Sequence, residues 1–408
     1  MRLISRVCKI VVFALLRFLG HVYPRNSRLV AIGAWQGKLY IDNPKYLLDY
    51  LLKETTYKVV WVGDEIIRRK LPNHNRLSFA RKGSFVAFVA LLRARTWICC
   101  QAIGMDLIGL PISGNACLVD LWHGIPIKKI GNKTPYAEKS YRVTNAGFLS
   151  ELYSRLMRHP VAWLTISSDK MGDILAEGVP YRYSRDKVLR CGSPRNDFLV
   201  LNANNHELIN ALKVKYSKLL GFDKSRRIVL YLPTWRMNGD VFSFYNLAEA
   251  DQIRFLRGLD SENAVLIEKH HFGTYERFPI AKESVCSYVV TKEMQDDVDV
   301  QEMLLIADVL ISDYSGAFID FGLLKRPCIH FAYDREEYAT NDSGLAYELE
   351  DVAAGEIVDT RDRLFDSISR ALSDGRFNPA GRYGDLVVYE TGTACRQIVS
   401  HIDRYAVE

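Results

Sequence analysis

The chain has 408 residues, of which 48% are hydrophobic and 25% are charged, and its net charge is +6. This length predicts two domains rather than one core, and the composition excludes an intrinsically disordered chain. The eight cysteines are scattered and form no CxxC pair, which indicates reduced thiols rather than a disulfide framework or a zinc site.

The charge is distributed unevenly along the chain. Residues 1–200 hold 31 Lys and Arg against 14 Asp and Glu, a net charge of +17, whereas residues 201–408 hold 23 against 34, a net charge of −11. A strongly basic half implies an anionic partner, which could be a nucleic acid, a phospholipid or a phosphorylated substrate. No aromatic-interleaved basic patch is present, which argues against nucleic acid.

The first 24 residues are predicted to form a basic amphipathic helix that lies on an anionic membrane surface. The apolar run of residues 10–16 is far shorter than the roughly 20 residues needed to span a bilayer, and no signal-peptide cleavage site follows it. The alternative is a helix that packs on the protein's own core. Four basic residues fall within an arc of about 80° on this helix: Arg2, Arg6, Lys9 and Arg17.

Residues 25–200 read as short apolar strands that alternate with amphipathic helices, which predicts a parallel, doubly wound sheet. The predicted helices cover residues 43–53, 84–94 and 168–177. The predicted strands cover residues 28–33, 57–62, 76–80, 96–101, 116–122, 162–166 and 187–191.

A second series of the same kind occupies residues 201–390, and a final helix is expected within residues 391–408. Two Rossmann-like domains with a cleft between them are typical of the glycosyltransferase-B architecture, which is the fold class we expect. The predicted strands cover residues 227–232, 264–269, 309–312 and 327–331, and the predicted helices cover 206–220, 248–258, 300–306, 316–324, 360–373 and 392–405.

The segment CLVDLWHGIPIKKIG, residues 117–131, is the strongest candidate for chemistry. In open α/β sheets, ligands bind just beyond the carboxyl ends of the strands. His123 lies at such an end beside Gly124, with Pro126, Lys128 and Lys129 close behind. An imidazole near cations suits acid–base chemistry on a phosphorylated substrate, although a histidine that merely packs against the loop is the plainer interpretation.

Three strand-end loops of the second domain carry further polar residues. Thr234 and Arg236 follow one strand, and together they could hold a phosphate. Lys269 and His271 follow a second strand. After a third strand, Ser315 and the amide of Gly316 would form a diphosphate site, while Asp313 would cap or orient the turn. Each of these features alone could be structural, and no metal-ligand cluster, Walker loop or GxGxxG motif is present.

The order of these motifs resembles the CDP-glycerol glycerophosphotransferases of teichoic acid and capsule synthesis over roughly residues 115–400. The matching residues are Leu121-Trp122-His123-Gly124-x-Pro126-x-Lys128-x-x-Gly131, Gly192-Ser193-Pro194-Arg195-Asn196-Asp197, Pro233-Thr234-Trp235-Arg236, Lys269-x-His271, Asp299-Val300-Gln301-Glu302, Ser312-Asp313-Tyr314-Ser315 and Glu390-Thr391-Gly392-Thr393-Ala394-Cys395-Arg396.

The resemblance implies a role for each motif. His123 would be the general base that activates an acceptor hydroxyl, and His271 would contact the transferred phosphate or the leaving group. The diphosphate would be held by Thr234, Arg236, Lys269, Ser315 and Gly316. Arg195 and Asp197 would lie near the interdomain hinge. Apart from the resemblance, we expect a structural role for Gly124 and Pro126. Lys128 and Lys129 are candidate phosphate ligands and are equally suited to face the acceptor at the membrane. The chain departs from the family pattern at Gly316, where a second serine is usual.

These features predict a peripheral enzyme at the cytoplasmic face of the bacterial plasma membrane. It would transfer glycerol phosphate, or a related polyol phosphate, from CDP-glycerol to an undecaprenyl-diphosphate-linked glycan and release CMP. No cofactor is required by the residues, although Mg²⁺ is compatible with the reaction. One alternative is a glycosyltransferase or epimerase that uses a nucleotide sugar, and another is a non-catalytic, basic membrane-binding protein.

Overall fold

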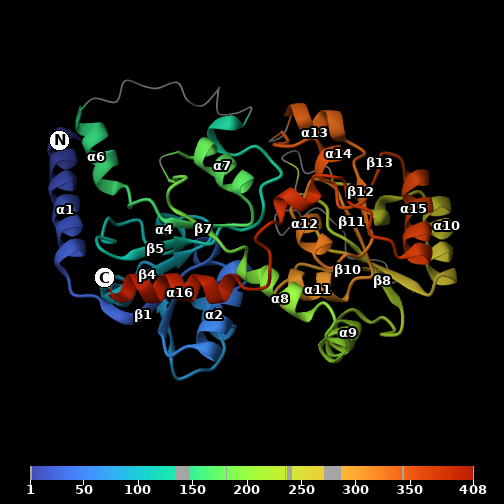
Figure 1. The fold of residues 1–408 in the computed structure, drawn as a ribbon, viewed down its shortest axis with the longest axis horizontal. Helices are drawn as coiled ribbons and strands as arrows, with labels where there is room; N and C mark the ends of the chain where they lie inside the picture. The colour runs from blue at the N-terminus through green and yellow to red at the C-terminus, as the bar shows by residue number, and fades with distance from the viewer. Residues whose placement is uncertain are drawn as a thin grey trace. The chain divides into compact units, whose positions relative to one another are not determined.

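The chain folds into two compact α/β units in the computed structural model (Figure 1). The structure describes residues 2–134, 148–180, 182–234, 236, 241–270, 286–341 and 344–407. The first unit comprises Met1–His123, Ala137–Asp197 and Tyr389–Glu408, and the second comprises Gly124–Tyr136 and Phe198–Val388. His123 therefore belongs to the first unit, whereas the residues that follow it belong to the second.

The first unit is built on a seven-stranded sheet in the order β3-β2-β1-β4-β5-β6-β7, with parallel neighbours throughout. Its strands are β1 (Asn26–Ile32), β2 (Lys58–Gly63), β3 (Leu77–Arg81), β4 (Ala94–Cys99), β5 (Cys117–Asp120), β6 (Trp163–Ile166) and β7 (Val188–Arg190). Its helices are α1 (Arg2–Val22), α2 (Asp42–Glu54), α3 (Phe85–Arg93), α4 (Ile103–Asp106), α6 (Phe148–Met157), α7 (Asp169–Gly178) and α16 (Ala394–Val407).

The second unit is built on a six-stranded sheet in the order β10-β9-β8-β11-β12-β13, again with parallel neighbours. Helix α8 (Pro194–Asn202) leads into it. Its strands are β8 (Arg227–Tyr231), β9 (Ala264–Glu268), β10 (Ser287–Val289), β11 (Val309–Ser312), β12 (Cys328–Phe331) and β13 (Glu356–Val358). Its helices are α9 (His206–Leu220), α10 (Glu249–Ser261), α11 (Val300–Ile306), α12 (Ala317–Gly322), α13 (Arg335–Asn341), α14 (Leu349–Val352) and α15 (Arg361–Asp374).

Both sheets are covered on their two faces, as parallel sheets usually are. In β1, Val30 and Ile32 belong to one buried apolar cluster, and Ala31 between them belongs to the other. In both sheets the strand order reverses direction beside the first strand, between β1 and β4 and between β8 and β11. Ligands of doubly wound folds bind at the carboxyl ends of the strands at this point, so the loops found there are the first place to look for a site.

Helix α1 packs on the first unit and also presents an apolar stripe to solvent. Leu16 and Leu19 pack against the core of the unit. Helix α1 lies beside α6 (Figure 1), and the ring of Phe13 lies 5.5 Å from that of Tyr153 in α6. Arg17, predicted for the membrane surface, donates to backbone carbonyls at the end of α6. No helix in the described part of the chain is long and apolar enough to cross a bilayer. The exposed stripe consists of Val11, Leu15, Phe18 and Val22.

Arg25 ties the end of α1 to the core, because its guanidinium donates hydrogen bonds to five backbone carbonyls. Burial, and then the nearby Arg95, lower the pKa of Arg25 to about 10, and the guanidinium lies 5.7 Å from the ring of Trp97. The acceptors are the carbonyls of Gly20, Leu91, Ala94, Ile112 and Ser113, at 2.8–3.1 Å.

Replacing Arg25 with methionine should lower the free energy of unfolding by about 3 kcal/mol or more, because several buried carbonyls lose their donor at once. Urea unfolding of the purified protein measures the change. The control is Arg68→Met, which removes an exposed ion pair with Glu65 and should change stability by less than about 1 kcal/mol. Equal effects of the two substitutions would show that Arg25 does not anchor α1.

Candidate functional site

His123 is presented by a strained turn that directly follows β5. The strand ends at Asp120, two residues earlier than its apolar run predicts, because Trp122 adopts a left-handed conformation with φ +53°. Gly124 follows with φ +134°, a region open to glycine. The Asp120 carboxylate accepts hydrogen bonds from the backbone N–H of Trp122 at 3.0 Å and from Arg182 at 2.7 Å. A buried carboxylate therefore fixes the turn.

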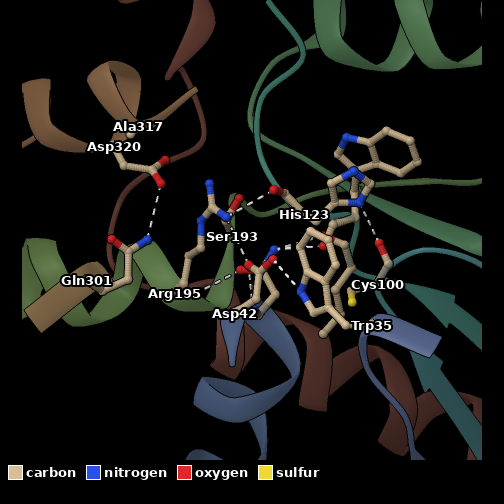
Figure 2. Close-up of polar contacts among 12 residues, drawn as sticks. Trp35, Asp42, Cys100, His123, Ser193, Arg195, Gln301, Ala317 and Asp320 are labelled. Carbon is tan, nitrogen blue, oxygen red and sulfur yellow. Dashed lines mark hydrogen bonds and ion pairs between the residues drawn. The ribbon is translucent and has the colours of Figure 1, made fainter. Parts of the chain in front are cut away.

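One ring nitrogen of His123 is occupied and the other is available as a base. Nδ1 lies 2.9 Å from the carbonyl oxygen of Cys100, just after β4 (Figure 2). A carbonyl only accepts hydrogen bonds, so Nδ1 carries the proton and Nε2 carries the lone pair in the neutral ring. The ring is half-buried between aromatic neighbours, with centroid distances of 4.2 Å to Trp122 and 5.4 Å to Trp35.

The residues after His123 belong to the second unit and form hydrogen bonds with its other segments. Ile127 accepts from the N–H of Ala346 at 2.8 Å, and Lys129 donates its N–H to Gly344 at 3.0 Å. The ammonium of Lys128 lies 5.3 Å from the ring centroid of Tyr338. Pro126 is buried and Lys129 is exposed. Of the two lysines predicted to face the acceptor, Lys128 thus has an aromatic contact, whereas Lys129 points to solvent.

In the second unit, Asp313 organises the loops after β8 and β11. Its carboxylate accepts hydrogen bonds from the N–H and hydroxyl of Thr234, at 2.9 and 2.5 Å, and from the N–H of Tyr314 at 2.7 Å. This geometry places Asp313, predicted to cap or orient the turn, between the two loops. The hydroxyl of Thr234, predicted as a phosphate ligand, is directed at Asp313, and Thr234 is only 7% exposed.

Arg236 is a buried partner of two carboxylates. It binds Asp313 at 2.8 Å and Asp334 at 2.6 Å, and its side chain is 4% exposed. Burial alone would lower the pKa of Arg236, but Asp313 and Asp334 outweigh that effect and raise it. The guanidinium also lies 4.6 Å from the ring centroid of Tyr338. In this geometry Arg236 holds the loop together, and its hydrogen-bonding groups are directed at protein acceptors rather than at solvent.

The accessible part of this region is the short turn that leads into α12. Ser315, Gly316 and Ala317 are half-buried, whereas the residues on either side are buried. The hydroxyl of Ser315 accepts from the N–H of Ala317 at 3.3 Å. A Cβ atom on Gly316 would lie 3.1 Å from the carbonyl oxygen of Ile125, closer than most real contacts. The absence of a side chain at Gly316 therefore lets the segment after His123 approach this turn closely.

Lys269 directly follows β9, beside the loop after β8. Its backbone N–H donates to the carbonyl of Tyr231 at 3.0 Å. Burial lowers the pKa of the Lys269 ammonium to about 8, and the nearby Asp299 opposes this shift only in part. A poorly solvated ammonium of this kind is well suited to gain an anionic partner.

The two adjacent histidines after β9 differ in what the structure describes. His271, predicted to contact the transferred phosphate, lies outside the described residues. His270 is 1% exposed, and its Nε2 lies 3.1 Å from the carboxylate of Glu268. His270 is thus part of the interior. No group of three His, Cys, Asp or Glu side chains able to hold a metal ion occurs among the residues that the structure describes.

Two residues at the start of α8 contact other parts of the first unit: Arg195 contacts His123, and Asp197 contacts the start of α16. Asp197 accepts the N–H groups of Ala394 and Cys395, at 2.9 and 2.8 Å, and thereby caps the start of α16. Arg195 donates to the carbonyl oxygen of His123 at 3.0 Å. The sequence indicated both residues through their motif, but it did not indicate that Arg195 contacts His123.

Several residues around the site were not identified from the sequence. Asp334 follows the end of β12, and a strand-end carboxylate was the signal that could have drawn attention to it. Asp42 and Asn43, at the start of α2, bind Arg195, and no local pattern distinguishes them from ordinary helix-start residues. Trp35 contacts the His123 ring, but the sequence around Trp35 contains no motif that would identify it.

Comparison with solved structures defines the class of fold. The structure of the wall teichoic acid polymerase TagF matches with a TM-score of 0.74 and 21% identity, covering 99% of this chain and 97% of that one. The two Rossmann-like sheets are thus those of a glycosyltransferase-B fold. The sequence profile of the CDP-glycerol:poly(glycerophosphate) glycerophosphotransferases matches residues 15–402. The chain belongs to this family of enzymes.

Two curated relatives are similar over most of their length. The teichoic acid poly(glycerol phosphate) polymerase of Bacillus spizizenii is 27% identical over 392 residues, covering 93% of each chain. The teichoic acid glycerol-phosphate transferase of Staphylococcus aureus is 27% identical over 346 residues, covering 85% of this chain and 84% of its own. The resemblance seen in the motifs is therefore confirmed over nearly the whole chain.

Proposed function

We propose that this enzyme transfers glycerol phosphate, or a related polyol phosphate, from CDP-glycerol to a hydroxyl of a glycan linked to undecaprenyl diphosphate. The observation that carries the proposal is the hydrogen bond between His123 Nδ1 and the Cys100 carbonyl, which leaves Nε2 as a base in a chain of the glycerophosphotransferase family. A variant of TagF has been solved after a soak with CDPG, which supports a CDP-activated donor here.

In the proposed reaction, the acceptor hydroxyl oxygen attacks the β-phosphorus of CDP-glycerol. His123 Nε2 takes the hydroxyl proton, a new P–O bond forms to the acceptor, and the bond to the CMP oxygen breaks. CMP leaves with the bonding electron pair. General-base catalysis of this kind contributes about 10²–10⁴-fold to a rate, and positioning with electrostatic stabilisation supplies much of the rest in phosphoryl transfer.

The donor would bind in the second unit at the turn of Ser315 and Gly316, with Lys269 as a charge partner. Thr234 and Arg236 would act through Asp313, which they hold in place, rather than by direct contact with phosphate. We infer no requirement for a resident cofactor. Mg²⁺ can accompany the diphosphate from solution. Comparing turnover in EDTA with turnover in added Mg²⁺ tests whether a resident cofactor is needed and whether Mg²⁺ takes part.

Attachment to the cytoplasmic face of the bacterial plasma membrane is part of the proposal. The exposed apolar stripe of α1, which includes Leu15 and Phe18, supports it, as does the net charge of +17 in residues 1–200. Apolar side chains combined with basic charge favour the surface of an anionic bilayer.

Vesicles of phosphatidylglycerol should co-sediment with the protein, and vesicles of phosphatidylcholine should do so far less. The double variant Leu15→Asp and Phe18→Asp should lose binding to the anionic vesicles, because two of the exposed apolar side chains would become charged. Ile253→Asp changes an exposed apolar residue of α10 and serves as the control. Unchanged binding of the double variant would remove α1 from the membrane contact.

Mass analysis of the product formed from CDP-glycerol and a synthetic lipid-linked disaccharide tests the reaction itself. The expected product carries one or more glycerol phosphate units, and CMP appears in equal number. A single added unit would indicate a priming enzyme, and a ladder of products would indicate a polymerase. Turnover of UDP-sugars alone, with CDP-glycerol left intact, would contradict the proposal.

The lowered pKa of Lys269 predicts how donor use depends on pH. Below about pH 8 the side chain is charged, and above it the charge is lost, so KM for CDP-glycerol should rise with pH by at most tenfold per unit. Lys269→Arg should flatten this rise, and Lys269→Met should give a high KM at every pH. Lys292→Met, at an exposed lysine, should behave as the wild type. A KM independent of pH in the wild type would exclude Lys269 from donor binding.

A further inference from the structure

Backbone strain in the described residues is concentrated around His123. Among the residues that the structure describes, six other than glycine have a positive φ, and four of them lie within residues 35–42 or directly beside His123. A left-handed conformation costs roughly 1–2 kcal/mol for such residues, and strain of this kind tends to gather at functional sites, where the surrounding structure holds it. The four are Trp35 with φ +46°, Gln36 with φ +60°, Asp42 with φ +67° and Trp122 with φ +53°.

The strained turn is held by side chains that bind three consecutive carbonyl groups. The amide nitrogen of Asn43 donates to the carbonyls of Leu121 and Trp122, each at 3.1 Å. The guanidinium of Arg195 donates to the carbonyl of His123 at 3.0 Å (Figure 2). Asn43 is fully buried, so these bonds form without competition from water.

The donors to the turn are themselves joined. The Asn43 side-chain oxygen accepts from the backbone N–H of Arg195 at 3.0 Å, and Asp42 forms an ion pair with the Arg195 guanidinium at 2.9 Å. The Asp42 and Arg195 side chains are only 6% and 13% exposed. Asp42 also accepts from the indole N–H of Trp35 at 3.3 Å, and that indole packs against the His123 ring. A single network thus contacts both the backbone and the ring of His123.

We propose that Asp42, Asn43 and Arg195 are positioning residues for the general base. They hold residues 121–123 in the left-handed turn that directs Nδ1 at the Cys100 carbonyl and leaves Nε2 for the acceptor hydroxyl. Without Asn43 the turn would relax toward less strained backbone angles and displace the imidazole. The inference rests on the proposed function, since it assigns these residues to the base of that reaction.

Asn43→Ala is expected to lower kcat by about 10- to 100-fold, because a displacement near 1 Å at a reacting group has effects of that order. KM for CDP-glycerol should stay within about twofold, since the donor is placed in the other unit. Tyr57→Phe is the matched control, because it removes the hydrogen bond that the buried Tyr57 donates to Asp403 in the same unit. It should lower thermal stability and leave kcat unchanged.

The same substitution is then made in a His123→Ala protein. There Asn43→Ala should cause no further loss of rate, because residues that act through one group are not additive. The inference would be overturned if Asn43→Ala kept the wild-type kcat or lowered kcat no more than Tyr57→Phe does. It would also be overturned if Asn43→Ala lowered the rate of the His123→Ala protein by the full factor that it causes in the wild type. The proposed function would survive any of these results as long as the wild type releases CMP from CDP-glycerol.

Nitrogen-15 NMR of labelled histidine tests the positioning without any turnover. The wild type should show His123 as the tautomer protonated at Nδ1, and Asn43→Ala should show a mixture of the two tautomers. An identical spectrum in the two proteins would overturn the inference. If CDP-glycerol proves not to be the donor, the proposed function fails, and this spectrum still decides whether Asn43 orients the ring.

Discussion

Replacing His123 with alanine should reduce kcat for CMP release from CDP-glycerol by about 10²-fold or more, with donor affinity nearly unchanged. Because Nδ1 of the imidazole binds the Cys100 carbonyl, Nε2 carries the lone pair that would accept the proton. Loss of a general base typically lowers a rate by about 10²–10⁴-fold. Donor affinity should be preserved because the proposed diphosphate site lies in the other unit. Single-turnover kinetics measures the chemical step, and calorimetric titration measures donor affinity.

His206→Ala is the control for this prediction, because His206 is exposed at the start of α9. It should leave both kcat and stability unchanged. Vesicle binding and thermal stability of His123→Ala should match the wild type. If His123→Ala retains more than about a tenth of the wild-type kcat, His123 is not the base, and a non-catalytic role of this turn becomes the better interpretation.

Replacing Arg236 with methionine should destabilise the protein by about 3–5 kcal/mol, because the buried Asp313 and the half-buried Asp334 would lose their cation. Donor binding should be lost at the same time, because Asp313 holds Thr234 and the start of the Ser315 turn. Urea unfolding measures the stability, and titration with CDP-glycerol below the unfolding transition measures binding.

A second substitution distinguishes two explanations for the effect of Arg236→Met: loss of the cation that compensates the carboxylates, and loss of a direct contact with the donor. Adding Asp334→Asn to Arg236→Met should recover part of the lost stability, since one uncompensated charge is removed. Arg335→Met is the control, because Arg335 pairs with Glu350 at the surface of the same unit and should cost less than about 1 kcal/mol. A stable Arg236→Met protein that fails only in donor binding would instead make Arg236 a phosphate ligand.

The sequence was sufficient to predict the architecture, because long apolar runs and helix caps are local signals. Helices α9 and α11 begin and end at the predicted residues. Strands β10 and β13, each of three residues at an edge of its sheet, were not predicted. The end of β5 was also misplaced. Leu121 and Trp122 are as apolar as the strand. Trp122 is held in a left-handed turn by a local hydrogen bond to Asp120 and by a bond from the distant Asn43, which no apolar pattern reveals.

The site was predictable where its residues follow strands and unpredictable where partners come from distant segments. His123 and the Ser315 turn were singled out as candidates from their places after apolar runs. The network of Asp42 and Arg195 joins residues 153 positions apart, so no local pattern reveals it. Arg236 was interpreted as a phosphate ligand because a strand-end arginine suits that role, and its pairing with Asp334 depends on a contact across 98 positions.

The poorly solvated Lys269 has a thermodynamic consequence for the handling of protons. Because burial lowers the pKa of the Lys269 ammonium to about 8, part of the protein lacks this proton in mildly basic buffer, and an incoming diphosphate would restore it. Formation of the complex would then take up protons from the buffer in that pH range. The observed heat of binding would consequently differ between phosphate and Tris buffers in proportion to their heats of ionisation, and it would become independent of the buffer near pH 6.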